Sequence, residues 1–89
     1  MNICFDIDGC LIDRDKKMIE ENVTLLKVLC KSHKVFLWSG NGWNYALTWA
    51  DELGILEIIC GVFNKYGTFR PDIAFDDQEI DLGKINIQI

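Results

Sequence analysis

The sequence predicts a single α/β domain, residues 1–89, built around a parallel β-sheet. Short apolar runs of strand-like composition alternate with two longer segments of helical periodicity, and the joints between them are short. Two of the apolar runs stop at acidic residues, near Asp8 and near Asp76. Because the carboxyl ends of parallel strands meet at one edge of a sheet, we expect a functional site at that edge.

The first third of the chain is expected to contain a strand, a loop and a helix. The strand runs from Ile3 to Ile7. The segment from Cys10 to Lys17 is rich in charge and lacks a period, which indicates a loop or small flap over the active edge with solvated charges. The helix is expected from Met18 to Ser32, because apolar residues recur there at helical spacing, namely Ile19, Val23, Leu26 and Cys30.

A second strand and helix follow. The strand is expected from Val35 to Trp38 and the helix from Asn41 to Leu53, and Gly54 provides a typical helix end. One face of this helix is apolar and consists of Ala46, Trp49, Ala50 and Leu53. Trp38 and Trp49 fit the core, and core packing is also the simpler expectation for Trp43, although its position beside the strand end would allow contact with a substrate.

Three more strands are expected, from Ile58 to Phe63, from Ile73 to Phe75 and, as a short edge strand, from Ile85 to Ile89. The first two are separated by only about ten residues, which is too few for a full crossover helix. The connection from Lys65 to Arg70 must therefore be tight, or the third strand lies elsewhere.

Composition limits the range of functions. Almost half of the 89 residues are apolar, which indicates a folded domain, and the net charge of −5 argues against a broad nucleic-acid-binding surface. No apolar run approaches the ~20 residues that cross a bilayer, so no membrane association is expected.

The four cysteines, Cys4, Cys10, Cys30 and Cys60, lack C-x-x-C spacing. Cys4, Cys30 and Cys60 lie in apolar segments, so we interpret them as reduced core thiols. The amino-terminal residues do not resemble a secretory signal, and we expect a cytoplasmic protein.

The acidic residues suggest the chemistry of the site. In an extended chain the side chains of Asp6 and Asp8 lie on the same face and would point into one crevice, where crowded carboxylates attract Mg²⁺. The plainer interpretation is that one caps a turn and the other is solvated. Asp76 and Asp77 would bring two further carboxylates to the same edge, and Ser39, Gly40 and Asn41 would bring a hydroxyl and backbone amides suited to phosphate.

These segments resemble the motifs of the haloacid dehalogenase superfamily of phosphatases and phosphotransferases. Its first motif, a strand followed by D-x-D-G-x-[TVL], reads Asp6-Ile7-Asp8-Gly9-Cys10-Leu11 here. Its second motif, a strand ending in Ser or Thr, corresponds to Ser39, and its fourth, a strand ending in an acidic pair, to Asp76-Asp77. The resemblance implies a three-layer Rossmann-like fold with strand order 5-4-1-2-3. It extends over nearly the whole chain.

The third motif of that superfamily is a lysine, and Lys65 is the best placed candidate. Arg70 is its competitor, and a solvated loop lysine is the alternative for Lys65. The short connection between the third and fourth expected strands departs from the family pattern and makes this motif the weakest of the four.

The resemblance implies phosphoryl transfer in two steps. Asp6 would be the nucleophile that forms an aspartyl-phosphate, and Asp8 the general acid and then the general base. Mg²⁺ would be held by Asp6, the backbone carbonyl of Asp8 and Asp77, with Asp76 supporting that shell or orienting the lysine. Ser39, Gly40 and Asn41 would bind phosphate, and Lys65 would neutralise its charge.

The sequence does not choose a substrate or a partner. The chain has no room for the cap domains that select substrates in this superfamily, so the leading expectations are a phosphorylated protein or nucleic-acid end, or a small phosphate bound in a homo-oligomer. A catalytically inactive binding or regulatory module is the main alternative. A receiver-like phosphoacceptor domain is disfavoured, because its acidic pair follows the first strand and its acceptor Asp the third, whereas Ile58 to Phe63 ends without an acid.

Overall fold

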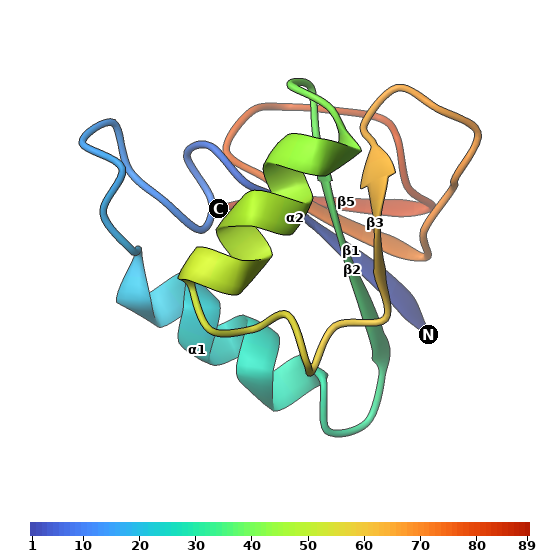
Figure 1. The fold of residues 1–89 in the computed structure, drawn as a ribbon. Helices are drawn as coiled ribbons and strands as arrows, with labels where there is room; N and C mark the ends of the chain where they lie inside the picture. The colour runs from blue at the N-terminus through green and yellow to red at the C-terminus, as the bar shows by residue number, and fades with distance from the viewer.

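Five parallel strands form one sheet in the computed structural model, which describes all of residues 1–89 (Figure 1). The strands are β1 (Asn2–Asp6), β2 (Lys34–Ser39), β3 (Gly61–Asn64), β4 (Ile73–Asp76) and β5 (Ile85–Gln88). Their order across the sheet is β3-β2-β1-β4-β5, all parallel. This confirms the expected order, with the first and fourth strands adjacent in the middle.

Two helices connect the first three strands, α1 (Glu20–Leu29) and α2 (Trp43–Glu52). Both are shorter than predicted, since the outermost residues of each predicted segment lie outside the helix. Strand β3 begins at Gly61 rather than at Ile58, because the amides of Ile58 and Ile59 bond back to the carbonyl of Ile55 in a turn. Sheet pairing starts only when Cys60 donates to the carbonyl of Val35.

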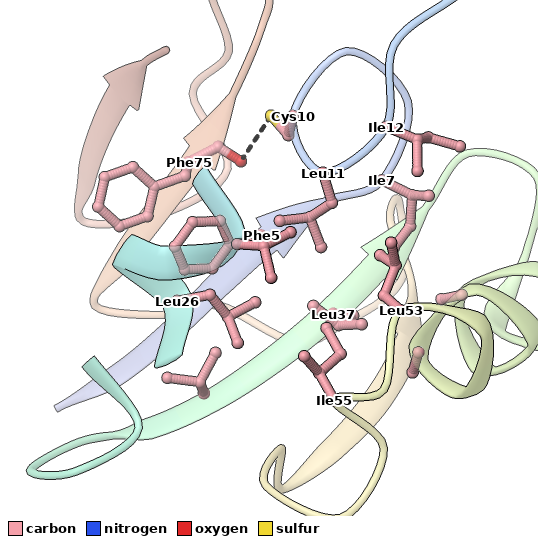
Figure 2. Packing of buried hydrophobic residues seen from close by; sticks show 14 of the residues in the cluster. Phe5, Ile7, Cys10, Leu11, Ile12, Leu26, Leu37, Leu53, Ile55 and Phe75 are labelled. Atoms are coloured by element: carbon pink, nitrogen blue, oxygen red, sulfur yellow. Dashed lines mark hydrogen bonds between the residues drawn. The ribbon is translucent and has the colours of Figure 1, made fainter. Parts of the chain in front are cut away.

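Both helices cover the same face of the sheet (Figure 1). The main core lies between them and strands β1 and β2, and Figure 2 shows its close packing. It contains Ile3 and Phe5 of β1, Val35 and Leu37 of β2, Val23 and Leu26 of α1, and Ala46 and Ala50 of α2. The predicted apolar faces of the two helices are therefore the buried ones, and each large side chain buried there stabilises the fold by about 1.5–3 kcal/mol.

The opposite face of the sheet is covered by loops, so the expected third layer contains no helix. Phe69, from the connection between β3 and β4, packs on Cys4, Trp38 and Ala74 and stacks on Phe63 with ring centroids 4.2 Å apart. The connection is too short for a helix, as its length suggested, and aromatic packing closes this side of the sheet instead.

Three further expectations concern the tryptophans, the cysteines and the possibility of a membrane-spanning helix. Trp38 is fully buried and Trp49 packs against the core, as expected, whereas Trp43 is 47 % exposed and does not pack in the core. All four cysteines are unpaired; the prediction that Cys60 is a core thiol is wrong, because this residue is exposed directly before β3 begins. Neither helix has the length and apolar content needed to cross a lipid bilayer.

Candidate active site

The carboxyl ends of four strands meet at one edge of the sheet. β1 ends at Asp6, β2 at Ser39, β3 at Asn64 and β4 at Asp76. Because the strands are parallel and in register, these residues lie on the same side of the molecule. A cleft of about 420 Å³ opens there without a hydrophobic side chain in its lining, which consists of Asp6, Asp8, Gly9, Asp13, Arg14, Lys16, Lys65, Asp77 and Gln78.

Lys65 lies buried at the base of this cleft between two buried carboxylates. Its ammonium nitrogen is 2.6 Å from Asp76 Oδ2 and 3.6 Å from Asp6 Oδ1, and the three residues are each at most 6 % exposed. Lys65 is therefore not a solvated loop lysine. Arg70, its competitor in the sequence, forms no ion pair.

The charges of this buried group influence one another. Burial and the neighbouring Asp76 raise the pKa of Asp6 to about 7, and Lys65 partly offsets this shift. Burial alone would lower the pKa of Lys65, but its hydrogen bond to Asp76 and the charge of Asp6 outweigh burial, so the pKa lies above its ordinary value. Lys65 is thus a cation held beside Asp6, and a second cation near Asp6 would further favour its ionised form.

A second group of side chains adjoins Asp6 and resembles a cation site. Carboxylate oxygens of Asp6 and Asp77 and the Cys10 sulfur lie within 4.8 Å of one another. Burial raises the pKa of the Cys10 thiol well above its ordinary value, and Sγ donates to the carbonyl of Phe75 at 3.8 Å (Figure 2). Asp6 and Asp77 therefore supply the hard oxygen ligands that suit Mg²⁺, whereas the protonated thiol is unsuited to it.

The two members of the acidic pair are placed differently. Asp77 is grouped with Asp6, whereas Asp76 is fully buried, pairs with Lys65 and accepts the amide of Gln78 at 3.0 Å. The arrangement favours Asp77 as the cation ligand and Asp76 as the residue that orients the lysine. The Asp8 side chain, in contrast, points to a different set of partners.

Gly9 makes the approach of Asp77 possible. Its φ of +81° lies in the left-handed region, and a Cβ at this position would overlap the Asp77 carboxylate. The glycine that follows Asp8 in the sequence is thus required both by its backbone conformation and by the side chain that packs against it.

We expect Gly9→Ala to destabilise the fold by about 1–3 kcal/mol, through backbone strain and steric overlap, and to displace Asp77. Gly54→Ala is the matched control, since Gly54 also has a positive φ, of +71°, but a Cβ at this position would meet no atom within 4 Å. Urea unfolding and Mg²⁺ titration of both variants test this. Equal effects on Mg²⁺ affinity would contradict the role assigned to Gly9.

The segment Ser39-Gly40-Asn41 forms a turn that leads into α2. Ser39 Oγ accepts the amide of Asn41 at 2.9 Å, which leaves its hydroxyl proton free for another acceptor, and the amide of the exposed residue Gly40 has no protein acceptor. These two donors could hold an anion. The Asn41 side chain instead donates to Asp8 Oδ2 at 3.3 Å.

Asn64 was not singled out by the sequence analysis. Its side chain accepts the amide of Trp43 at 2.8 Å and so satisfies one of the free amides at the start of α2. Its position directly after an apolar run was the available signal, because Ser39 and Asp76 occupy the same position at the ends of their strands.

Lys16 and Tyr45 are the other two residues that sequence reasoning missed. Both contact the Asp8 carboxylate, although Lys16 was expected to be solvated and Tyr45 was not considered. No local pattern identifies either residue, since one lies in an aperiodic loop and the other at a half-buried position of a helix.

Comparison with known proteins agrees with this geometry. A family model described as haloacid dehalogenase-like hydrolase matches residues 3–68, a range that contains Asp6, Asp8, Ser39 and Lys65 and ends before Asp76. No curated protein and no solved structure gave a significant match.

Proposed function

This chain belongs to the haloacid dehalogenase-like hydrolase family, and we propose that it is a Mg²⁺-dependent phosphohydrolase or phosphotransferase that acts on a phosphomonoester. The observation that carries the proposal is the buried Asp6 carboxylate, which lines a polar cleft beside Lys65 and near the Asp77 carboxylate. A carboxylate beside a buried cation and a second acidic group is suited to attack on phosphorus.

In the first step, an Asp6 oxygen forms a bond to phosphorus while the bond from phosphorus to the leaving oxygen breaks. The leaving oxygen takes a proton from Asp8, and the product on the protein is an aspartyl-phosphate at Asp6. In the second step, water attacks this phosphorus and transfers a proton to Asp8, and Asp6 is released as a carboxylate. Inorganic phosphate is the second product.

Asp6 and Asp77 are the side chains that would hold Mg²⁺, which when bound would reduce the repulsion between Asp6 and a phosphate dianion. Lys65 neutralises charge on the transferred group, and Asp76 keeps the lysine in place. Ser39 and the Gly40 amide donate to phosphate oxygens. Asn41 was also expected to bind phosphate, and its amide group would have to leave Asp8 to do so.

The lining of the cleft supports a polar substrate. No hydrophobic side chain faces it, and Arg14, one of the lining residues, forms no ion pair within the protein. No domain is inserted between β1 and α1 or between β3 and β4 that would cover the cleft. A small phosphorylated metabolite and the phosphorylated end of a protein or nucleic acid are the substrate classes that we propose.

The deciding experiment measures phosphate release from aryl phosphate, nucleotides, sugar phosphates, phosphopeptides and end-phosphorylated oligonucleotides, with Mg²⁺ and with EDTA. Release that requires Mg²⁺ is the expected result. Thermal melting with and without Mg²⁺ tests binding independently, since Mg²⁺ at 100 times its Kd would stabilise the fold by about 2.7 kcal/mol. Absence of both release and binding would contradict the proposal and favour an inactive module.

We also propose a compartment and an assembly. Four unpaired cysteines support a reducing compartment such as the cytoplasm. Ile85 and Ile87 are 53 % and 38 % exposed on edge strand β5 and support a homo-oligomer formed through this edge. Light scattering that reports a monomer at micromolar concentration would exclude the oligomer.

A further inference from the structure

Three side chains from two separate segments form hydrogen bonds with the carboxylate of Asp8. Tyr45 of α2 donates its hydroxyl proton to Oδ1 at 2.8 Å, and the flap residue Lys16 donates to the same oxygen at 3.1 Å. Lys16 also donates to the Tyr45 hydroxyl at 3.0 Å, which closes a triangle of hydrogen bonds. Asn41, in the turn that leads into α2, contacts the other oxygen, Oδ2, at 3.3 Å.

These contacts matter because Asp8 is not held by burial. Its side chain is 43 % exposed, whereas the side chain of Asp6 is 9 % exposed, so packing alone leaves Asp8 free to rotate. A group that transfers a proton must lie within hydrogen-bond distance of the atom that gives or receives this proton, and a small misplacement lowers the rate. The orientation of Asp8 therefore depends on its hydrogen-bond partners.

The two partners of Oδ1 are anchored in different ways. Tyr45 packs against the main core through α2, whose buried residues Ala46 and Ala50 fix the helix on the sheet. Lys16 has a φ of +62°, a conformation that non-glycine residues rarely adopt, and its amide donates to the carbonyl of Asp13 within the flap. The backbone of the flap is thus bent where its lysine reaches Asp8.

We propose that Tyr45 and Lys16 are positioning residues that direct the Asp8 carboxyl group toward the leaving oxygen, and that Lys16 couples this orientation to the conformation of the flap. This inference rests on the proposed function, because it requires Asp8 to transfer a proton. It assigns a role to two residues outside the motifs on which the family resemblance depends.

The test uses phenyl phosphate and 4-nitrophenyl phosphate, which differ little in shape. Phenolate needs a proton from the protein more than nitrophenolate does, so misplacement of Asp8 should affect phenyl phosphate more. The quantity to compare is kcat/KM, because it reports only the steps up to release of the leaving group and excludes hydrolysis of the aspartyl-phosphate.

For Tyr45→Phe and Lys16→Met we expect kcat/KM to fall by about 10- to 100-fold with phenyl phosphate and by less than about 3-fold with 4-nitrophenyl phosphate. Lys17→Met is the matched control, since the side chain of Lys17 is exposed and makes no contact with Asp8, and both rates should be unchanged. Lys16 is also exposed, so its variant is expected to fold even if Tyr45→Phe does not.

Equal losses with the two substrates would overturn the inference, since they would indicate that the residues bind the phosphate group or maintain the fold. Unchanged rates would overturn it as well. Failure of the underlying function is recognised separately, because the wild-type protein would then release phosphate from neither substrate in the presence of Mg²⁺.

Discussion

Asp6→Asn is expected to abolish phosphate release while leaving the fold intact. The amide retains the shape of the side chain but is a poor nucleophile toward phosphorus, so turnover should fall by roughly 1,000-fold or more. Lys65 also pairs with Asp76, at 2.6 Å in the wild type, so the substitution leaves no buried charge without a partner. Phosphate release measured beside thermal melting tests both parts of this prediction.

Asp51→Asn is the matched control for Asp6→Asn. Asp51 is exposed on α2, outside the cleft lining, and its side chain makes no ion pair, so the same chemical change should leave turnover and melting unaltered. Activity retained in Asp6→Asn would contradict the assignment of the nucleophile. A large drop in melting temperature would instead mean that Asp6 is mainly structural.

Lys65→Met is expected to remove both activity and much of the stability. It leaves Asp76, which is fully buried, without its cation, and breaking a buried ion pair in this way costs roughly 3–5 kcal/mol. That is a large share of the stability of a small domain. Urea unfolding should therefore show a midpoint well below that of the wild type, and phosphate release should be lost.

Two further variants make this result interpretable. Arg70→Met removes a cation that forms no ion pair and should change neither the urea midpoint nor phosphate release. Lys65→Met combined with Asp76→Asn removes the uncompensated charge and should recover part of the stability without recovering activity. If only Arg70→Met reduced the rate, Arg70 rather than Lys65 would fill the third motif.

Much of this protein is determined by local features of the sequence. Apolar runs of strand length and two amphipathic segments specify which residues are buried, so the helical face with Ala46 and Ala50 was predicted correctly. The alternation of these elements favours a parallel sheet. Asp6, Ser39 and Asp76 each end an apolar run, so their position at one edge follows from the sheet alone.

The first and last residues of the helices and strands were less predictable. They depend on hydrogen bonds that the periodicity of apolar residues does not indicate. Ile58 is apolar and β-branched, but its amide bonds within a turn, so β3 begins later. Cys60 lies in an apolar run and is nevertheless exposed, directly before edge strand β3 begins.

Only the tertiary structure decided how the site residues are paired. Lys65 and Arg70 are both cations in one short connection, and the packing of Phe69 over the sheet accompanies the burial of Lys65 between Asp6 and Asp76. The adjacent carboxylates Asp76 and Asp77 differ because one is enclosed with the lysine and the other approaches Gly9.

The surroundings of Asp8 were also decided by the tertiary structure. The sequence identified the carboxylate, but its contacts with Lys16 and Tyr45 join positions 8, 16 and 45, which lie in a loop and a helix with no shared pattern. Local propensity and periodicity act over a few residues, whereas such pairings arise when separate elements pack together. The sequence by itself determined the elements and the chemistry at their ends, and the packing of the chain determined which charges meet.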